Sequence, residues 1–338
     1  MFSWLSLKSN WIRASLGVLV GIVFFALVLR RTSWQEVQDI LQQTDGRWIG
    51  LAIAAYGMSM VVRVERWRLL LWDVKALSFK SMSVALLVGY AMNNILPARL
   101  GELVRADFAG RRYDLSRSAT IASIALERTL DGLIVVLSLI LGRFFVSQNS
   151  LLNTLTIAGI VLFVGVAIAL WFISAHQLSK WLERLPQPIY ERVLSFRTGL
   201  SAMRGQQLGK VIGFSLSVWM CEAIAYWLVL RSINISLDWR QILLVLGVIN
   251  LSTLIPSAPG YAGTYQYAYS FVLGLFGFSA AAGIAAATSA QLFLFGSTTL
   301  IGLALYSYTN AQTLRATPQR EKLSQLTKPT SQGDHSRR

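Results

Sequence analysis

Residues 95–101 read Ile95-Leu96-Pro97-Ala98-Arg99-Leu100-Gly101, and they interrupt a largely apolar stretch that runs from Met82 to Gly110. A second apolar stretch, from Gln241 to Phe278, is interrupted by Ile255-Pro256-Ser257-Ala258-Pro259-Gly260. Proline removes a backbone hydrogen-bond donor and glycine permits a sharp turn. Each interruption therefore predicts a helix that is broken into two arms. In both stretches a glycine follows a proline by four residues.

The composition indicates that these stretches belong to a membrane protein. Of 338 residues, 54% are hydrophobic and only 14% are charged, and the apolar residues gather into long blocks. A helix that crosses a hydrocarbon core of about 30 Å needs roughly 20 mostly apolar residues. Six blocks approach this length and predict full spans; they are approximately Trp11 to Leu29, Arg47 to Val62, Ala119 to Leu141, Leu152 to Ile173, Val211 to Leu230 and Gly283 to Tyr306.

The charge of the loops predicts how the spans are oriented. Basic residues are in excess in alternate loops, which are residues 1–13, 63–80, 99–117, 176–210 and 309–338. Loops rich in Lys and Arg remain in the cytoplasm, so both termini are expected there, with the chain in an inner (plasma) membrane. This orientation holds if the first broken segment enters and leaves on the cytoplasmic side and the second enters and leaves outside.

We therefore predict an all-α polytopic membrane protein with about six full spans and two oppositely oriented re-entrant helical hairpins. Such a pair suits an inverted repeat of the kind found in transporters. The alternative is that each hairpin is two full spans, which leaves both termini on the same side. Residues 1–310 are the predicted transmembrane domain, and residues 311–338, which lack a hydrophobic core, are a predicted disordered cytoplasmic tail.

Several classes of function are disfavoured by the residues present. The net charge of +15 is spread over many loops without a nucleic-acid-binding motif, so we expect anionic lipid and not nucleic acid as its partner. Cys221 is the single cysteine, and His176 and His335 are the only histidines. A metal site and a histidine-dependent catalytic site are therefore not expected. Glycine-rich nucleotide loops are also lacking, and we predict neither a cofactor nor catalytic residues.

The strongest candidate site lies in the predicted span from Ala119 to Leu141, which contains Glu127, Arg128 and Asp131. Ionisable groups inside a membrane cost several kcal/mol unless they are paired or hydrated. Glu127 and Asp131 are four residues apart and share a helix face, and Arg128 can pair with Asp131 three residues later. We expect this face to line a wet cavity, although a purely structural ion pair is an equal alternative.

A second candidate lies in the first hairpin, where Asn93 and Asn94 precede the break and Arg99, Glu102 and Arg105 follow it at spacings of three. If Pro97 opens the second arm, these charges lie in its first turns, where backbone donors favour an anion. The planar guanidinium of arginine suits phosphate. The alternative is an interfacial helix whose arginines extend to the membrane surface.

Two further regions are weaker candidates. Glu222 is the single carboxylate of its span, and it is either a structural hydrogen-bonding group or a coupling group. The second hairpin is polar but uncharged, which suits either a tight turn or the lining of a site for a zwitterionic group. Its candidate residues, together with those of the first hairpin that would act as gates, are Pro97, Gly101, Pro256, Pro259, Gly260, Gly263 and Gln266.

Leu96 to Glu102 with Arg105, Leu126 to Arg128 with Asp131, and Pro256 to Gly263 together resemble the lysylphosphatidylglycerol synthase transmembrane family. The resemblance covers roughly residues 10 to 310. It implies a flippase-like domain that moves lipids between leaflets, here in a short form without the soluble synthase domain. Gln266 stands where the family pattern implies a glutamate, so the second hairpin has no ionisable group and cannot pair an acid with the first.

We therefore expect a transporter, not an enzyme, that acts on a membrane phospholipid or a lipid-linked intermediate. Arg99 and Arg105 would attract phosphate, while Glu127 and Asp131 would balance that charge. The alternatives are an intramembrane enzyme that acts on lipid carriers and a noncatalytic accessory subunit of envelope lipid synthesis. The sequence leaves the oligomeric state open, with a homo-oligomer among the options.

Overall fold

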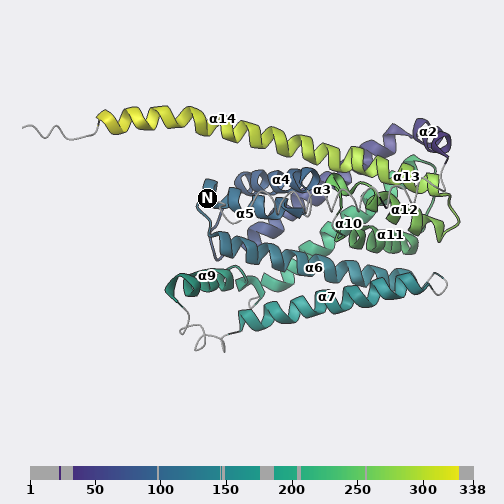
Figure 1. Cartoon of the computed structure of the whole chain (residues 1–338), viewed down its shortest axis with the longest axis horizontal. Coiled ribbons are helices and arrows are strands. Elements are labelled where there is room, and N and C mark those ends of the chain that lie inside the picture. The colour runs from purple at the N-terminus through teal and green to yellow at the C-terminus, as the bar shows by residue number, and fades with distance from the viewer. Residues whose placement is uncertain are drawn as a thin grey trace, which may run out of the picture.

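The computed structural model describes residues 23, 33–96, 99–144, 146, 149–175, 186–203, 207–255 and 257–326, with side chains up to residue 311. Within these ranges the chain is helical and contains no strand. Long helices lie side by side along one direction, and shorter helices fill the two ends of the bundle (Figure 1). The prediction of an all-α polytopic membrane protein is confirmed in class.

Four helices are long and apolar enough to cross a membrane: α3 (Gly46–Leu70), α7 (Ser150–Ser174), α10 (Gln207–Ser232) and the continuous helix over Ala280–Ala311. They match four of the six predicted spans. A fifth, α6 (Arg117–Arg143), has 27 residues and is long enough, but it carries the charged residues near its middle. The sixth predicted span, Trp11 to Leu29, lies outside the described residues apart from Val23.

Polar side chains at the helix starts fix where the helices begin. Ser116 accepts a hydrogen bond from the backbone of Ala119 at the start of α6, and Asn149 accepts one from Leu152 at the start of α7. Each cap satisfies a backbone N–H in the first turn that has no partner within its own helix. The helix boundaries therefore follow local polar residues as well as the apolar blocks.

Small residues let the long helices approach one another closely. Gly142 of α6 lies against Leu244 of α11 (Trp239–Ser252), and Gly247 of α11 lies against Leu139 of α6. A side chain at either glycine would overlap the facing helix. Close contact through small residues is the usual way in which membrane helices pack. By contrast, α7 exposes Ile157, Val161 and several other large apolar side chains, as a lipid-facing helix does.

The two broken stretches form two helix pairs. The first consists of α4 (Phe79–Ile95) and α5 (Gly101–Tyr113), and the second of α11 and α12 (Thr264–Gly274). Figure 1 shows the first pair toward one end of the bundle and the second toward the other. Every arm is shorter than the roughly 20 residues that a full crossing needs. The positions of the two pairs show that they are oppositely oriented (Figure 1). The short arms suit re-entrant hairpins, but re-entrance into a bilayer stays a prediction.

The last long helix changes its hydrogen bonding at the height of the hairpin tips. Helix α13 (Ala280–Ser289) continues through a π-helical segment, η5 (Ala290–Phe295), into α14 (Gly296–Leu326). Helical backbone thus continues past residue 310, where we placed the domain boundary. Residues 327–338 lie outside the described part, so the disordered tail stays a prediction there. Between α7 and α10, the short helix α9 (Gln187–Thr198) has no buried residue.

Candidate functional site

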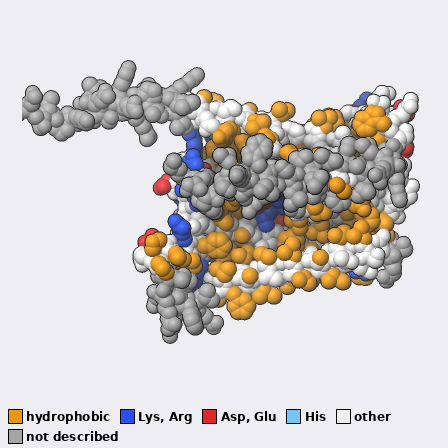
Figure 2. Space-filling model, in the orientation of Figure 1, with side chains coloured by type: hydrophobic (Ala, Val, Ile, Leu, Met, Phe, Trp, Pro, Cys, Tyr) orange, Lys and Arg blue, Asp and Glu red, His pale blue; other side chains and the backbone are white. Residues whose placement is uncertain are grey.

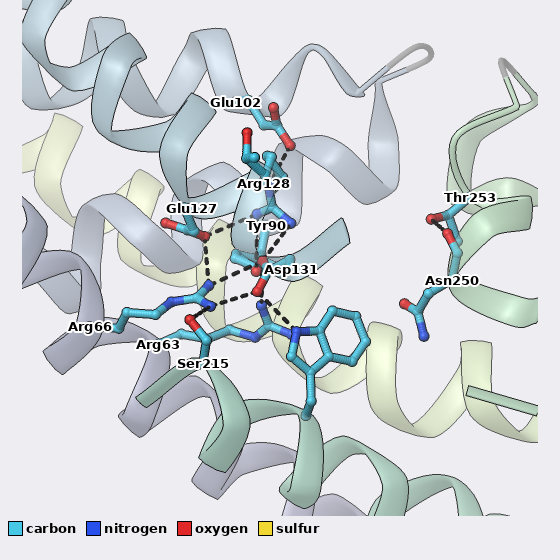
Figure 3. Close-up of polar contacts among 12 residues, drawn as sticks. Arg63, Arg66, Tyr90, Glu102, Glu127, Arg128, Asp131, Ser215, Asn250 and Thr253 are labelled. Atoms are coloured by element: carbon cyan, nitrogen blue, oxygen red, sulfur yellow. Dashed lines mark hydrogen bonds and ion pairs between the residues drawn. The ribbon is translucent and has the colours of Figure 1, made fainter. Parts of the chain in front are cut away.

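The bundle contains a cluster of ionisable side chains from α3, α6 and α10, joined by residues of the first hairpin (Figure 3). Helix α3 contributes Arg63 and Arg66, and α10 contributes Glu222. Each of these three residues is at most 5% exposed. Figure 2 shows basic and acidic side chains in a hollow about halfway along one face, surrounded by hydrophobic side chains. We use the name ion cluster for the set of side chains joined by ion pairs, which are Arg63, Arg66, Arg105, Arg128, Glu102, Glu127, Asp131 and Glu222.

Asp131 is one centre of the ion cluster. Arg66 donates to both of its carboxylate oxygens, at 2.6 Å and 3.1 Å, and Trp219 donates its indole N–H at 3.0 Å. Arg63 approaches the same carboxylate at 3.7 Å and pairs with Glu222. The bidentate contact from Arg66 fixes the orientation of the Asp131 carboxylate because the guanidinium is rigid and planar.

Glu127 is the second centre. Arg105 of α5 pairs with it at 2.9 Å, Arg66 at 3.3 Å and Arg128 at 3.2 Å. The guanidinium carbon of Arg105 lies 3.6 Å from the centre of the Trp67 ring, so its other face is covered by an aromatic side chain. Arg105 therefore does not face open space, contrary to our expectation that it attracts a phosphate.

Arg128 connects the cluster to the first hairpin. Its guanidinium lies 2.9 Å from Glu102, 3.6 Å from Asp131 and 3.3 Å from the hydroxyl of Tyr90. The predicted pairing of Arg128 with Asp131 is present at the spacing of three. Figure 3 shows Arg128 between Glu102 on one side and the two acidic centres on the other.

The charges of the ion cluster balance. The members, defined by these ion pairs, are Arg63, Arg66, Arg105, Arg128, Glu102, Glu127, Asp131 and Glu222. Arginines and carboxylates are equal in number. Removing charges from water is costly, and mutual pairing offsets that cost. The ion cluster therefore requires no additional ion for neutrality.

A cavity of about 120 Å³ lies beside the ion cluster. Of the predicted site residues, five line it: Asn94, Arg99, Arg128, Asp131 and Glu222. Arg105 and Glu127 are buried and do not line the cavity. Glu102 lines an adjoining groove, and Asn93 lines a smaller pocket at the hairpin tip. The remaining lining is mainly aromatic and amide side chains, among them Tyr56, Tyr90, Trp219, Tyr226, Asn250 and Tyr261.

Arg99 adds a positive charge that the ion cluster does not contain. Its guanidinium donates to the carbonyl oxygen of Thr253 at 3.1 Å and to the hydroxyl of the same residue, and it lies over the ring of Tyr261. No carboxylate among the described residues forms an ion pair with it. The cavity therefore has one arginine that is held only by neutral groups.

The tips of the two hairpins meet at this cavity. Besides the contact between Arg99 and Thr253, Asn94 donates to the carbonyl of Phe295 at 3.3 Å and to the hydroxyl of Thr299 at 2.8 Å. On the other side, Gln291 of η5 donates to the carbonyl of Gly260 at 2.7 Å. The π-helical segment thus contacts both tips, and α14 contacts the first.

The predicted gating residues have different structural roles. Gly101 lies so close to the backbone of Asn93 and Gly89 that a side chain would overlap them, while Gly260 and Gly263 have φ angles of 65° and 86°. Gln266 is buried, accepts from the backbone N–H of Gly263 and donates to Gln291, so it braces the turn and does not line the cavity. Pro259 begins the short turn η4 (Pro259–Tyr261). Pro97 and Pro256 lie outside the described residues.

Comparison with known proteins places this architecture in a family. The family model described as the lysylphosphatidylglycerol synthase TM region matches residues 14–302. The chain belongs to this family. No solved structure matches it.

Relatives of this lysylphosphatidylglycerol synthase TM family member include archaeal membrane proteins. A UPF0104 membrane protein of Methanothermobacter thermautotrophicus is 21% identical over 86% of this chain and 94% of its own length. A protein named Glycosyltransferase AglD from Haloferax volcanii is 24% identical over 80% of this chain but only 50% of its own length. A UPF0104 membrane protein of Methanocaldococcus jannaschii is 22% identical over 68% of this chain and 99% of its own length.

Two members of the ion cluster, Arg63 and Arg66, are absent from our predicted site. The sequence predicts that the second span ends at Val62 and that both arginines belong to a cytoplasmic loop; this is wrong, because α3 continues to Leu70. The run Val61-Val62-Arg63-Val64-Glu65-Arg66-Trp67 puts Arg63 and Arg66 three residues apart, and hence on one helix face, between apolar residues. This spacing of three is the sequence signal that could have identified Arg63 and Arg66 as site residues.

Proposed function

We propose that the protein moves a phosphate-bearing lipid between the two leaflets of a membrane. The observation that carries the proposal is the charge of the cavity: the ion cluster is neutral in itself, and Arg99 is a further cation held only by neutral groups. A guanidinium can bind a phosphate through two parallel hydrogen bonds, and phosphate is the anionic group that membrane lipids carry. The cavity is lined by Arg128 and Asp131 near the middle of α6, at a level where a head group in transit has to be sheltered from hydrocarbon.

The size of the cavity limits what enters it in this conformation. Its volume is about 120 Å³. An apolar cavity of about 150 Å³ holds one benzene molecule. A phosphate group with a small substituent matches this space better than a bulky sugar chain. We infer that larger head groups require the hairpin tips to separate.

The contacts between the tips support a gating role. Arg99 holds Thr253, and Asn94 and Gln291 hold the first and second tip against the helix that contains η5. These contacts are hydrogen bonds to neutral groups, each of which contributes only about 0.5–3 kcal/mol. A bound phosphate that takes the N–H groups of Arg99 releases Thr253, and with it the second hairpin.

We propose transport and not catalysis. Each carboxylate of the ion cluster already contacts at least one arginine, so none of them is free to hydrogen-bond a reacting group as an acid or base has to do. The match to half of a protein named a glycosyltransferase supports a second candidate, a membrane unit that serves an enzyme acting on lipid carriers. Product formation in detergent micelles, where leaflets do not exist, would favour the second candidate.

We also propose that the end of the bundle with the outer ends of α4 and α5 faces the cytoplasm in the plasma membrane. Arg111, Arg112 and Arg117 lie at the corner between α5 and α6, and Figure 1 shows the extended end of α14 and α9 at the same end of the molecule. Basic residues at this surface would attract anionic lipid. We propose that both termini lie on this cytoplasmic side.

The test is lipid exchange in reconstituted vesicles. Fluorescent phospholipids in both leaflets are bleached from outside with a membrane-impermeant reductant, and the exchange rate is compared for wild type, Arg99→Gln and Arg111→Gln. We expect Arg99→Gln to slow exchange roughly tenfold or more, because a hydrogen bond to a charged group contributes about 1.5–3 kcal/mol. Arg111 lies in the same hairpin but is exposed and pairs with Asp107, so Arg111→Gln is the control. Equal rates in the two variants would remove the basis of the proposal.

A further inference from the structure

A groove next to the cavity has mainly apolar walls, whereas the cavity is lined by charged and polar side chains. It has a volume of about 300 Å³ and lies between α5, α6 and α7. Its apolar walls include Leu103, Ile121, Ile124, Ala125, Leu162 and Val166. Leu103 and Leu162 are 45% and 49% exposed, so the groove opens at the surface of the bundle.

The groove and the cavity share part of their walls. Arg128, Phe163 and Leu254 line both. Glu102 lines only the groove, while Asp131 lines only the cavity. The guanidinium of Arg128 therefore stands at the junction of a polar site with an apolar one. A molecule held there by an anionic group has an apolar wall on one side, which is the arrangement an amphiphile requires.

The pairing of Arg128 with Glu102 leaves hydrogen-bonding capacity unused. Their atoms Nε and Oε1 are 2.9 Å apart, so the two side chains form an ion pair. Both atoms are nevertheless buried without a hydrogen-bond partner among the described residues, because the N–H of Arg128 is not directed at the oxygen. Buried polar groups without a partner are rare in proteins. An oxygen of a ligand that aligns with this N–H satisfies it.

We propose that the groove binds one hydrocarbon chain of a phosphate-bearing membrane lipid, with the phosphate at Arg128 and Glu102 as the competing anion. This inference rests on the proposed function and adds the place where the lipid lies before it reaches Arg99. The groove volume of about 300 Å³ is about twice that of a cavity that holds benzene, which is room for a segment of one chain. A hydrocarbon chain is the expected occupant because the surface that flanks the groove, on α7, is itself exposed and apolar.

The first test uses two tryptophan variants on one helix. Val166 lines the groove and is 37% exposed, whereas Val164, two residues earlier and 41% exposed, does not line it. The full-length protein in vesicles is labelled with phosphatidylglycerol that carries a photoreactive diazirine on one acyl chain, and the modified peptides are identified by mass spectrometry. We expect labelling of α5, α6 and α7 at the groove to fall about tenfold in Val166→Trp and to be unchanged in Val164→Trp, because a bulky side chain in a packed site excludes the ligand.

The second test addresses the phosphate. Glu102→Gln removes the competing anion from Arg128, so labelling by the phosphatidylglycerol probe is expected to rise severalfold. A diacylglycerol probe with the same chain but no phosphate is expected to label the groove weakly and equally in wild type and in this variant. Equal labelling by both probes would show that Arg128 does not hold the phosphate and would overturn that part of the proposal.

Failure of this inference can be told apart from failure of the proposed function. If lipid exchange depends on Arg99 but Val166→Trp and Val164→Trp label and exchange alike, the groove is wrong and transport stands. If the probe labels the groove as expected but exchange does not occur in wild type, the groove is a lipid site and transport is wrong. Labelling that is confined to other faces of the bundle contradicts the groove in either case.

Discussion

The two hairpins share a pattern of proline and glycine but contribute different chemistry. The first carries Arg99, Glu102 and Arg105, whereas the stretch from Gln241 to Phe278 contains no Asp, Glu, Lys or Arg. In the structure the second hairpin meets the first through a backbone carbonyl and a hydroxyl of Thr253. One hairpin thus supplies fixed charge and the other supplies neutral acceptors.

This difference explains how the charge of Arg99 stays available for an anionic ligand. A carboxylate from the second hairpin would neutralise Arg99 and compete with any anionic ligand. Neutral oxygens hold the side chain in place and leave its charge unbalanced. The glutamine at position 266, which braces Gly263 and Gln291, is consistent with this arrangement because it adds no charge near the tip.

The largest effect is expected from removing a charge of the first hairpin. Arg105→Ala leaves Glu127 with Arg66 and Arg128 but deletes the 2.9 Å pair and the contact with Trp67. Breaking a buried ion pair costs about 3–5 kcal/mol, and we expect the lower end because two arginines remain. The measurement is the free energy of unfolding in mixed detergent micelles. Arg111→Ala, in the same helix but exposed, should change it by less than about 1 kcal/mol; similar losses in both variants would contradict a structural role for Arg105.

An intermediate effect is expected at the two matching glycines. Gly101→Ala places a methyl group against the backbone of Asn93 and Gly89, and overpacking of this kind costs about 1–3 kcal/mol because the backbone has to move. Gly260 has only the carbonyl of Asn94 nearby, at 3.6 Å, so Gly260→Ala costs mainly the positive φ angle, about 1–2 kcal/mol. Unfolding of both variants in micelles gives the order. A larger loss at Gly260 than at Gly101 would show that the first tip is less tightly packed than described.

The smallest effect is expected at the neutral acceptor. Thr253→Val keeps the shape of the side chain and removes the hydroxyl that accepts from Arg99, while the carbonyl remains. We expect a loss of about 1 kcal/mol in the free energy of unfolding, typical of one hydrogen bond. In the Arg99→Gln background the same substitution should cost less, because the partner is already altered, and a double-mutant cycle measures the difference. Full additivity would mean that the two tips are not coupled through this contact.

Much of the helical framework was predictable because it follows from local sequence. Apolar blocks of about 20 residues predicted α3, α7, α10 and the last helix, and the span that contains Glu127, Arg128 and Asp131 follows from its charges as the leading candidate site. Helix ends were less predictable. The sequence predicts that the second span ends at Val62, eight residues before α3 does, because Arg63 and Arg66 indicate a loop; both are instead buried in α3.

The sequence by itself determined that the chain lies in a membrane, where its helices are broken and which span carries charge, since each of these follows from the cost of placing neighbouring residues in hydrocarbon. Only the tertiary structure decided which charges meet. Arg66 pairs with Asp131 across 65 residues of chain, and Arg63 pairs with Glu222 across 159. Such pairing depends on how helices pack, and no local pattern encodes that distance. The same packing enclosed Arg105 and left Arg99 beside the cavity.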